Sequence, residues 1–273
     1  WSGSTPANGS SKSFLTDDGL NVTIAFSNVT NGNQLVPSQM NTWSGAVLHL
    51  LYNFNNSNIR PALFRSELAG GVTNISFTMT ISATRNGAPA PFTFIAADAE
   101  ASTADEVSTF TTNGSNWSVL EFFKNSSQNI NPLTGCGTAT AILKSTYGNA
   151  TATGQNPILA TTSPASGSLT VRTSLDNTVR GGMAVAFGIF APVDRGDLPA
   201  SFGFAQHNLA YSNVNGCNYN PPLPVMIQDT RLKIGAVAGD ADNVQTLNDN
   251  TEGVDEEALT SFPFYDGSGN YTL

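Results

Sequence analysis

The chain has 273 residues, of which 40% are hydrophobic and 11% charged, and its formal net charge is −9. This length suits one large β domain or two smaller ones. The negative charge, without any Lys/Arg cluster, argues against nucleic acid and anionic membranes as partners. No window approaches the roughly 20 apolar residues of a membrane span. Asn, Ser, Thr and Gly supply a neutral, hydrogen-bonding surface, which is typical of extracellular β proteins.

Strand-like runs recur along the first 190 residues. Residues 20–26 and 75–83 alternate apolar and polar side chains, as half-buried strands do. The run 47–52 is almost continuously apolar and indicates a more buried strand. The buried side of the second run is expected to hold Ile75, Phe77, Met79, Ile81 and Ala83. Further strands are expected at 92–97, 118–123, 139–143, 169–172 and 183–190.

Asn-Gly pairs at Asn31, Asn86 and Asn113 mark turns between these runs. No segment shows an amphipathic period of helix length. Many strands separated by turns, without helices, predict an all-β fold built as a β-sandwich.

The two cysteines, Cys136 and Cys217, both lie in Gly/Asn-rich loops. Buried free cysteines usually have apolar neighbours, which these two lack. We therefore expect a disulfide between them, in keeping with the extracellular character of the surface; the alternative is two separate thiols. Closing a loop of about 80 residues stabilises a fold by roughly 4 kcal/mol in the chain-entropy model.

The composition changes after the strand at 183–190. The sequence Gly196-Asp197-Leu198-Pro199 breaks the apolar run, because proline cannot donate to a ladder and Asp-x-Pro favours a turn. Proline and asparagine then become frequent, and His207 is expected in a polar loop. We expect a sandwich domain over residues 1–194. A loop-rich acidic extension over 195–273 should pack on it and be held by the disulfide.

Several segments, taken in order, resemble a known family. They are the G-D-x-P-x-S-[FY]-G motif at 196–203, the runs 74–87, 96–100 and 111–117 before it, and 231–235, 240–242 and 252–257 after it. This order is similar to that of bacterial surface adhesins of the CshA type, in which a lectin-like β-sandwich precedes the motif and an acidic segment follows it. The resemblance implies a lectin-like sandwich, a cell-surface location and a binding or structural role. It implies no particular ligand.

No Ser-His-Asp or Cys-His grouping, phosphate-binding loop or metal motif can be assembled from the sequence. His49 and His207 are therefore interpreted as structural, and no enzymatic activity is expected. Ten Asn-x-Ser/Thr sequons occur, a modest excess over chance that does not establish glycosylation.

Four carboxylates form the candidate ligand-binding site. Asp98 and Glu100 lie two residues apart, on the same side of an extended strand and about 7 Å from each other. A glycosidase pair has this spacing too, but without a pocket nothing raises either pKa, so the catalytic interpretation is the weaker one. Together with Asp105 and Glu106 they suggest a cation or sugar site at one end of the sandwich. The alternative is a set of surface carboxylates.

Acidic residues after position 239 supply the oxygen ligands that calcium requires. Their spacing is not that of an EF-hand, and most charge runs are solvated loops. Calcium is thus one of two open interpretations, and it is the only cofactor that the sequence suggests. The candidate ligands are Asp240, Asp242, Asp249, Glu252, Asp255, Glu256 and Glu257.

Residues 262–265 and 269–273 are β-prone. In the adhesins that the chain resembles, such a stretch opens the next domain; without one, an unpaired strand seeks a sheet edge. We expect one terminus to pair with a neighbouring subunit by strand addition. The pairing would involve either Tyr271 and Leu273 or the N-terminal stretch with Trp1. The alternatives are a frayed tail or a fragment of a longer adhesin.

Three functions follow from these observations. The preferred one is an extracellular, non-enzymatic subunit of a surface filament that serves adhesion and self-associates into a polymer. The second is a monomeric adhesin module that binds a glycan or a host protein. A carbohydrate-active enzyme is the hypothesis that the sequence favours least.

Overall fold

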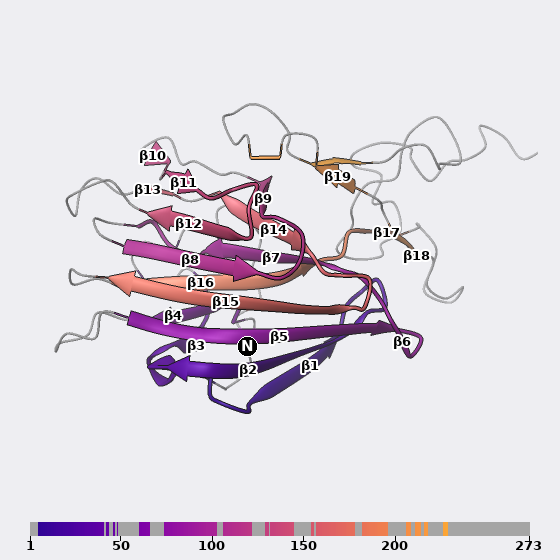
Figure 1. Cartoon of the computed structure of the whole chain (residues 1–273), viewed down its shortest axis with the longest axis horizontal. Helices are drawn as coiled ribbons and strands as arrows, with labels where there is room; N and C mark the ends of the chain where they lie inside the picture. The colour runs from indigo at the N-terminus through magenta and orange to yellow at the C-terminus, as the bar shows by residue number, and fades with distance from the viewer. Residues whose placement is uncertain are drawn as a thin grey trace, which may run out of the picture. The chain divides into compact units, whose positions relative to one another are not determined.

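The structure is a computed structural model. It describes residues 5–40, 42–43, 46, 48, 60–65, 74–102, 106–121, 129–130, 132–144, 154–155, 157–177, 182–195, 206–208, 211–213, 216–217 and 226–228. These residues are almost entirely β, with a short 3₁₀ turn, η1 (Gly32–Gln34). Two antiparallel sheets pack as a sandwich (Figure 1), so the predicted all-β sandwich is confirmed.

Sheet A has eight strands in the order β1-β2-β5-β15-β8-β12-β11, with β6 paired to β5. β15 lies near its centre and runs antiparallel to both β5 and β8. The strands are β1 (Ser11–Leu15), β2 (Asn21–Thr30), β5 (Asn74–Arg85), β6 (Ala88–Pro89), β8 (Glu106–Thr112), β11 (Leu133–Thr134), β12 (Thr140–Lys144) and β15 (Ser168–Asn177).

Sheet B has six strands in the order β3-β4-β16-β7-β14-β9. β16 lies inside this sheet, antiparallel to β4 and β7. The strands are β3 (Val36–Ser38), β4 (Ala62–Arg65), β7 (Thr93–Asp98), β9 (Ser118–Glu121), β14 (Ile158–Thr162) and β16 (Met183–Phe190).

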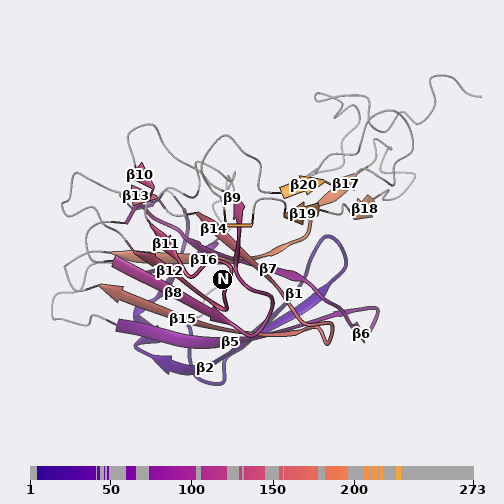
Figure 2. The same ribbon diagram turned by 45° about the horizontal axis from the view of Figure 1, so that its top comes forward.

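Three short pairs complete the described strands. β10 (Asn129–Ile130) pairs with β13 (Gly154–Gln155), β17 (Val193–Arg195) with β18 (Gln206–Asn208), and β19 (Tyr211–Asn213) with β20 (Met226–Gln228), as Figure 2 shows for the last pair. His207 therefore lies in a strand, and the expectation of a loop there was wrong. Its short strand has no apolar pattern and is defined by its pairing with β17.

The chain divides into two compact units. One comprises Trp1–Phe190 and Asn213–Ile227, the other Ala191–Ser212 and Gln228–Leu273. The chain thus leaves the first unit after Phe190, returns to it for a short stretch that contains Cys217, and leaves again. The predicted boundary at 194 lies close to the first departure, and the packing of the extension on the sandwich stays a prediction.

β5 illustrates how the sequence builds the core. Its alternate residues Ile75, Phe77, Met79, Ile81 and Ala83 are all buried, as the alternation predicts. The two-residue turn after β5 is also as predicted, because Asn86 and Gly87 both have positive φ, at 51° and 80°. A two-residue hairpin of this type requires such angles at both positions.

Phe187 of sheet B connects the two sheets. Its ring stands edge-on to Phe77 and Phe110 of sheet A, with centroids 6.1 and 6.2 Å apart, and stacks on Phe94 at 5.7 Å. Such pairs add about 0.5–1.5 kcal/mol each beyond the burial of area. The aromatic cluster therefore fixes how the sheets face each other.

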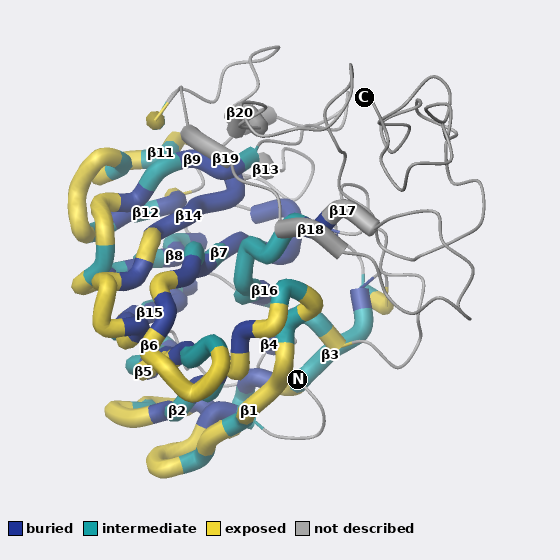
Figure 3. Tube along the Cα trace, turned by 90° about the vertical axis from the view of Figure 1, so that its right-hand side faces the viewer, coloured by how far each residue is buried: buried dark blue, intermediate teal, exposed yellow. Residues whose placement is uncertain are grey.

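The first half of β16, up to Ala186, is buried on both faces, in keeping with its apolar run. Met183 and Val185 face the core between the sheets. Ala184 and Ala186 belong to a second core on the outer face of sheet B, together with Met40, Ala46 and Leu48. In Figure 3 the strands of sheet B are mostly buried, whereas β1 runs along the exposed surface.

The other predicted strands can be compared directly. The runs 92–97, 118–123, 139–143 and 169–172 correspond to β7, β9, β12 and β15, of which β15 extends further, to Asn177. Most of the run 47–52, and the whole motif at 196–203, lie outside the described residues.

Thr173 offers a test of this core. It is fully buried in β15 between Phe77 and Phe110 on the neighbouring strands, and its hydroxyl has no partner among the described residues. A buried hydroxyl without a partner costs about 1–3 kcal/mol, and valine has nearly the same shape. We expect Thr173→Val to raise the free energy of unfolding by about 1 kcal/mol in denaturant titration. Thr170→Val, at a partly exposed position of β15, should change little. A less stable Thr173→Val variant would contradict the absence of a partner.

Candidate functional site

Buried charged side chains gather at one end of the sandwich. Arg65 ends β4, Asp98 ends β7 and Glu106 begins β8. Neighbouring residues of β16 pair with Arg65 and Asp98, so this strand brings the two ends together. Arg65, Glu106 and the nearby Glu100 are all buried. We call Asp98, Glu100 and Glu106, with Arg65, the end cluster.

Glu100 is the most enclosed carboxylate of the end cluster, at 6% exposure. Trp43 Nε1 donates a hydrogen bond of 2.8 Å to Glu100 Oε2. The Trp43 ring stacks on Phe64 of β4, with centroids 4.4 Å apart, and Ala46 forms an isolated bridge to Glu100. Glu100 thereby holds residues of the 42–46 segment against sheet B.

Asp98 is bonded within its own turn. Its Oδ1 accepts the Glu100 N–H at 3.1 Å, and its Oδ2 accepts the Ser102 hydroxyl at 2.9 Å. An aspartate that bonds the backbone two residues on offers the chain an alternative to the ladder. β7 ends at Asp98, but the Ala99 N–H still donates to the Ala184 carbonyl of β16 at 2.9 Å, and Glu100 forms the bridge to Ala46.

The electrostatics of the end cluster follow from burial. Desolvation raises the pKa of Glu100 well above its usual value, and the neighbouring charges of Asp98 and Glu106 raise it further, against a smaller opposite effect of the Trp43 hydrogen bond. Burial also lowers the pKa of the Arg65 guanidinium. The expectation that nothing raises the pKa of Asp98 or Glu100 was therefore wrong for Glu100, because burial does so.

The structure brings three of the four predicted ligand-binding carboxylates together, and Asp105 lies outside the described residues. In the described part of the chain, no group of three or more His, Cys, Asp or Glu side chains has the geometry to hold a metal. Ligand binding by the end cluster stays a prediction. So does calcium binding by Asp240 and the other acidic residues after it, which lie outside the described residues.

The raised pKa of Glu100 predicts a pH-dependent stability. The folded chain holds this proton more tightly than the unfolded chain does. The stabilisation is therefore complete below the unfolded pKa, about 4.3, and is lost as the pH rises through the higher folded pKa. Glu100→Gln keeps an oxygen acceptor for Trp43 and removes the charge.

We expect Glu100→Gln to match the parent near pH 3.5 and to be the more stable protein near pH 8. The difference should be about 1.4 kcal/mol for each pH unit between the two pKa values. Thermal unfolding from pH 3.5 to 8 measures it, with the acid value as internal control. Equal stability near pH 8 would contradict a buried carboxyl that ionises at a cost.

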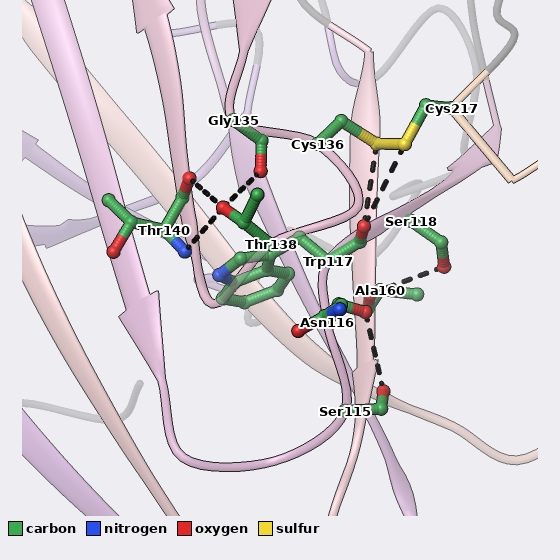
Figure 4. The surroundings of a disulfide bond; sticks show 10 residues. All are labelled: Ser115, Asn116, Trp117, Ser118, Gly135, Cys136, Thr138, Thr140, Ala160 and Cys217. Atoms are coloured by element: carbon green, nitrogen blue, oxygen red, sulfur yellow. Dashed lines mark hydrogen bonds between the residues drawn. A yellow bond between two sulfur atoms is a disulfide. The ribbon is translucent and has the colours of Figure 1, made fainter.

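Cys136 and Cys217 are placed as a disulfide, with their Cα atoms 5.7 Å apart. Cys136 lies in the turn between β11 and β12. Both sulfur atoms lie near the carbonyl oxygen of Trp117, at 3.4 and 4.0 Å (Figure 4). The predicted cysteine pair thus has the geometry of a bond, next to a buried aromatic residue.

Trp117 anchors this corner in the core. It is fully buried and packs against Phe110, with ring centroids 6.1 Å apart. The backbone N–H of Trp117 donates to the carbonyl of Thr138 at 2.9 Å, and its backbone carbonyl accepts the Gly137 N–H at 2.8 Å. The turn that carries Cys136 is therefore bonded directly to a core residue.

The outer strands of the two sheets differ in how well they are protected against pairing with a strand of another chain. The Val119 N–H of β9 donates to the Gly216 carbonyl at 2.8 Å. The segment that carries Cys217 therefore covers that edge. β3 contains Pro37, which lacks an N–H, and β11 has only two residues. Proline, short strands and covering segments are common protections against edge pairing.

β1 has neither a proline nor a covering segment in the described part of the chain, where it pairs only with β2, and its one charged residue is Lys12. It has five residues, and it exposes Phe14 by 41% and Leu15 by 72%. Sequence analysis did not single out these residues. The short run SKSFL stands out only once the structure shows that it is the edge strand of an eight-stranded sheet.

The described residues thus form a β-sandwich with a cysteine pair placed for a disulfide and with an exposed edge strand, β1. Comparison with protein families identifies the family. The family described as surface adhesin CshA non-repetitive domain 2 matches residues 1–190, and the chain belongs to this family. No match was found among curated proteins or among solved structures.

Membership of this family gives the chain a role in adhesion at the cell surface. In the described residues, no helix has the length and apolar character needed to cross a bilayer. The family resemblance predicted from the sequence is confirmed.

Proposed function

We propose that this chain is an adhesion module that assembles with copies of itself into a surface filament, by addition of a strand to the edge of β1. The observation that carries the proposal is the unprotected edge of β1, with Phe14 and Leu15 exposed beside it. Exposed edges with apolar side chains are templates for pairing with another chain.

The backbone of β1 offers alternating bonding groups. Phe26 N–H donates to Ser10 O, and Thr16 N–H donates to Leu20 O, both at 2.9 Å, at the two ends of the β1–β2 ladder. Bonded pairs alternate along an antiparallel ladder. Lys12 and Phe14 therefore bond β2, whereas the N–H and C=O groups of Ser11, Ser13 and Leu15 point outward. Three residues are thus available to a further strand.

On the core-facing side β1 presents Phe14 and Lys12, which pair with core residues of β2. Phe14 pairs with Val22, a fully buried core residue, yet keeps 41% of its own surface exposed. An added strand with alternate apolar residues would extend this side of the sandwich over Phe14. The segment 269–273, outside the described residues, has Tyr271 and Leu273 at alternate positions.

Charge supports this donor. The 40 residues 234–273 contain eight carboxylates and no Lys or Arg, whereas β1 carries Lys12 and no acid. Opposite charge favours encounter of the acidic stretch before the donor with β1, whereas residues 269–273 themselves carry no charged side chain. Because donor and acceptor are different segments, the contact is heterologous, and repetition gives an open filament rather than a closed dimer.

The decisive variant is Ser13→Pro. Proline removes the outward N–H of Ser13 and leaves the β1–β2 ladder intact, a position at which edge strands tolerate it. Ser13→Ala is the matched control, because it also loses the hydroxyl contact with Thr23 Oγ1, 2.7 Å long. An unpaired acceptor costs about 1–3 kcal/mol. We therefore expect Ser13→Pro to weaken self-association about tenfold or more, and Ser13→Ala to leave it unchanged.

Sedimentation velocity over a concentration series, with negative-stain imaging, measures the effect. Removal of residues 262–273 should abolish polymers, whereas removal of residues 1–10 would do so if Trp1 belongs to the donor. A parent that stays monomeric at high concentration overturns the proposal and leaves the monomeric glycan- or protein-binding adhesin. Unchanged polymers in Ser13→Pro would exclude β1 as the acceptor.

A further inference from the structure

The Cys136–Cys217 pair encloses the central strands of the sandwich. A sequence separation of 81 leaves 80 residues between the two cysteines. This closed segment contains β12, β14, β15 and β16. β15 bonds β5 and β8 in sheet A, and β16 bonds β4 and β7 in sheet B. One central strand of each sheet therefore belongs to the covalently closed loop.

Tension in a chain follows its shortest covalent path. With the bond formed, a pull between the N-terminal strands and residues beyond Cys217 passes from Cys136 directly to Cys217. Residues 137–216 then bear no backbone tension. Without the bond, the same pull first opens the contact between Gly216 and Val119 and then, through residue 191, draws on β16.

The point where tension enters the sandwich is also well fixed. Cys136 lies in a turn between two glycines with positive φ, Gly135 at 76° and Gly137 at 80°. Side chains are strained at such angles, and a Cβ at Gly135 would lie 2.0 Å from the Thr140 carbonyl oxygen. This turn is bonded to the buried Trp117 on one side. On the other, Thr138 Oγ1 accepts the Thr140 N–H at 3.2 Å.

We propose that the Cys136–Cys217 bond is a mechanical staple, which keeps β15 and β16 out of the path of tension when the adhesin is pulled. An adhesion protein bears force whenever the attached cell is displaced. The staple transfers that force to the turn at Cys136 and away from the strands on which both sheets depend. The inference rests on the cell-surface role of the family and not on self-association, so the two tests fail independently.

Single-molecule force spectroscopy tests the staple on the full chain held at its two ends, before and after reduction of the same folded protein. In the oxidised protein, the 80 enclosed residues stay inside the loop. At roughly 3.6 Å per residue, the released contour should be shorter by about 290 Å than after reduction. The first unfolding event should also need a higher force when oxidised.

A second pulling geometry separates a mechanical role from general stabilisation. One handle is placed at the N-terminus and the other in the exposed turn at Ala165 and Ser166, inside the loop. The pull then reaches the enclosed strands directly, so the extra force of the oxidised protein should fall or vanish. A variant with Cys136→Ala and Cys217→Ala should behave like the reduced protein in both geometries.

Three results would overturn the inference. Equal contour lengths before and after reduction would show that the bond is absent. A shorter contour with an unchanged unfolding force would show that the bond does not guide the tension. An equal force increase in both geometries would show stabilisation without mechanical shielding.

Discussion

The two sheets are joined by the aromatic cluster around Phe187, and the other features of the fold depend on this contact. Phe187 reaches Phe77 and Phe110 across the sandwich, so β16 is held over β5 and β8. Thr173 lies between those two sheet A residues, in β15. The cluster thus sets the register between the sheets.

The charged end of the sandwich has a different role from its core. Glu100, Glu106 and Arg65 are buried where β4, β7 and β8 meet. Burying charge is costly unless partners are close. The hydrogen bond from Trp43 Nε1 offsets part of this cost at Glu100. The same bond holds residues of the 42–46 segment over the alanine-rich outer face of sheet B. The carboxylates therefore have a structural use in the described contacts, whatever else they bind.

The edges of the sandwich are treated unequally. Pro37, the brevity of β11 and the segment around Cys217 protect three margins, and the fourth, at β1, exposes a phenylalanine and a leucine. Cell-surface proteins lie in an oxidising environment in which disulfides persist. The same cysteine pair that encloses the central strands also brings the cover to β9. Protection of one edge and closure of the central strands are thus linked by a single bond.

The alternation of apolar residues determined much of the fold by itself, because side chains on a strand change faces at every residue. The alternation gave the core face of β5, the Asn-Gly pair predicted the turn at Asn86 and Gly87, and the order of motifs indicated the family. Spacing also placed Asp98 near Glu100. Only the tertiary structure decided that Trp43 donates a hydrogen bond to Glu100, that the Thr173 hydroxyl lacks a partner among the described residues, and that β1 is an edge strand. Each of these depends on residues far apart in the chain that meet only after the sheets have packed, and local sequence carries no record of that order.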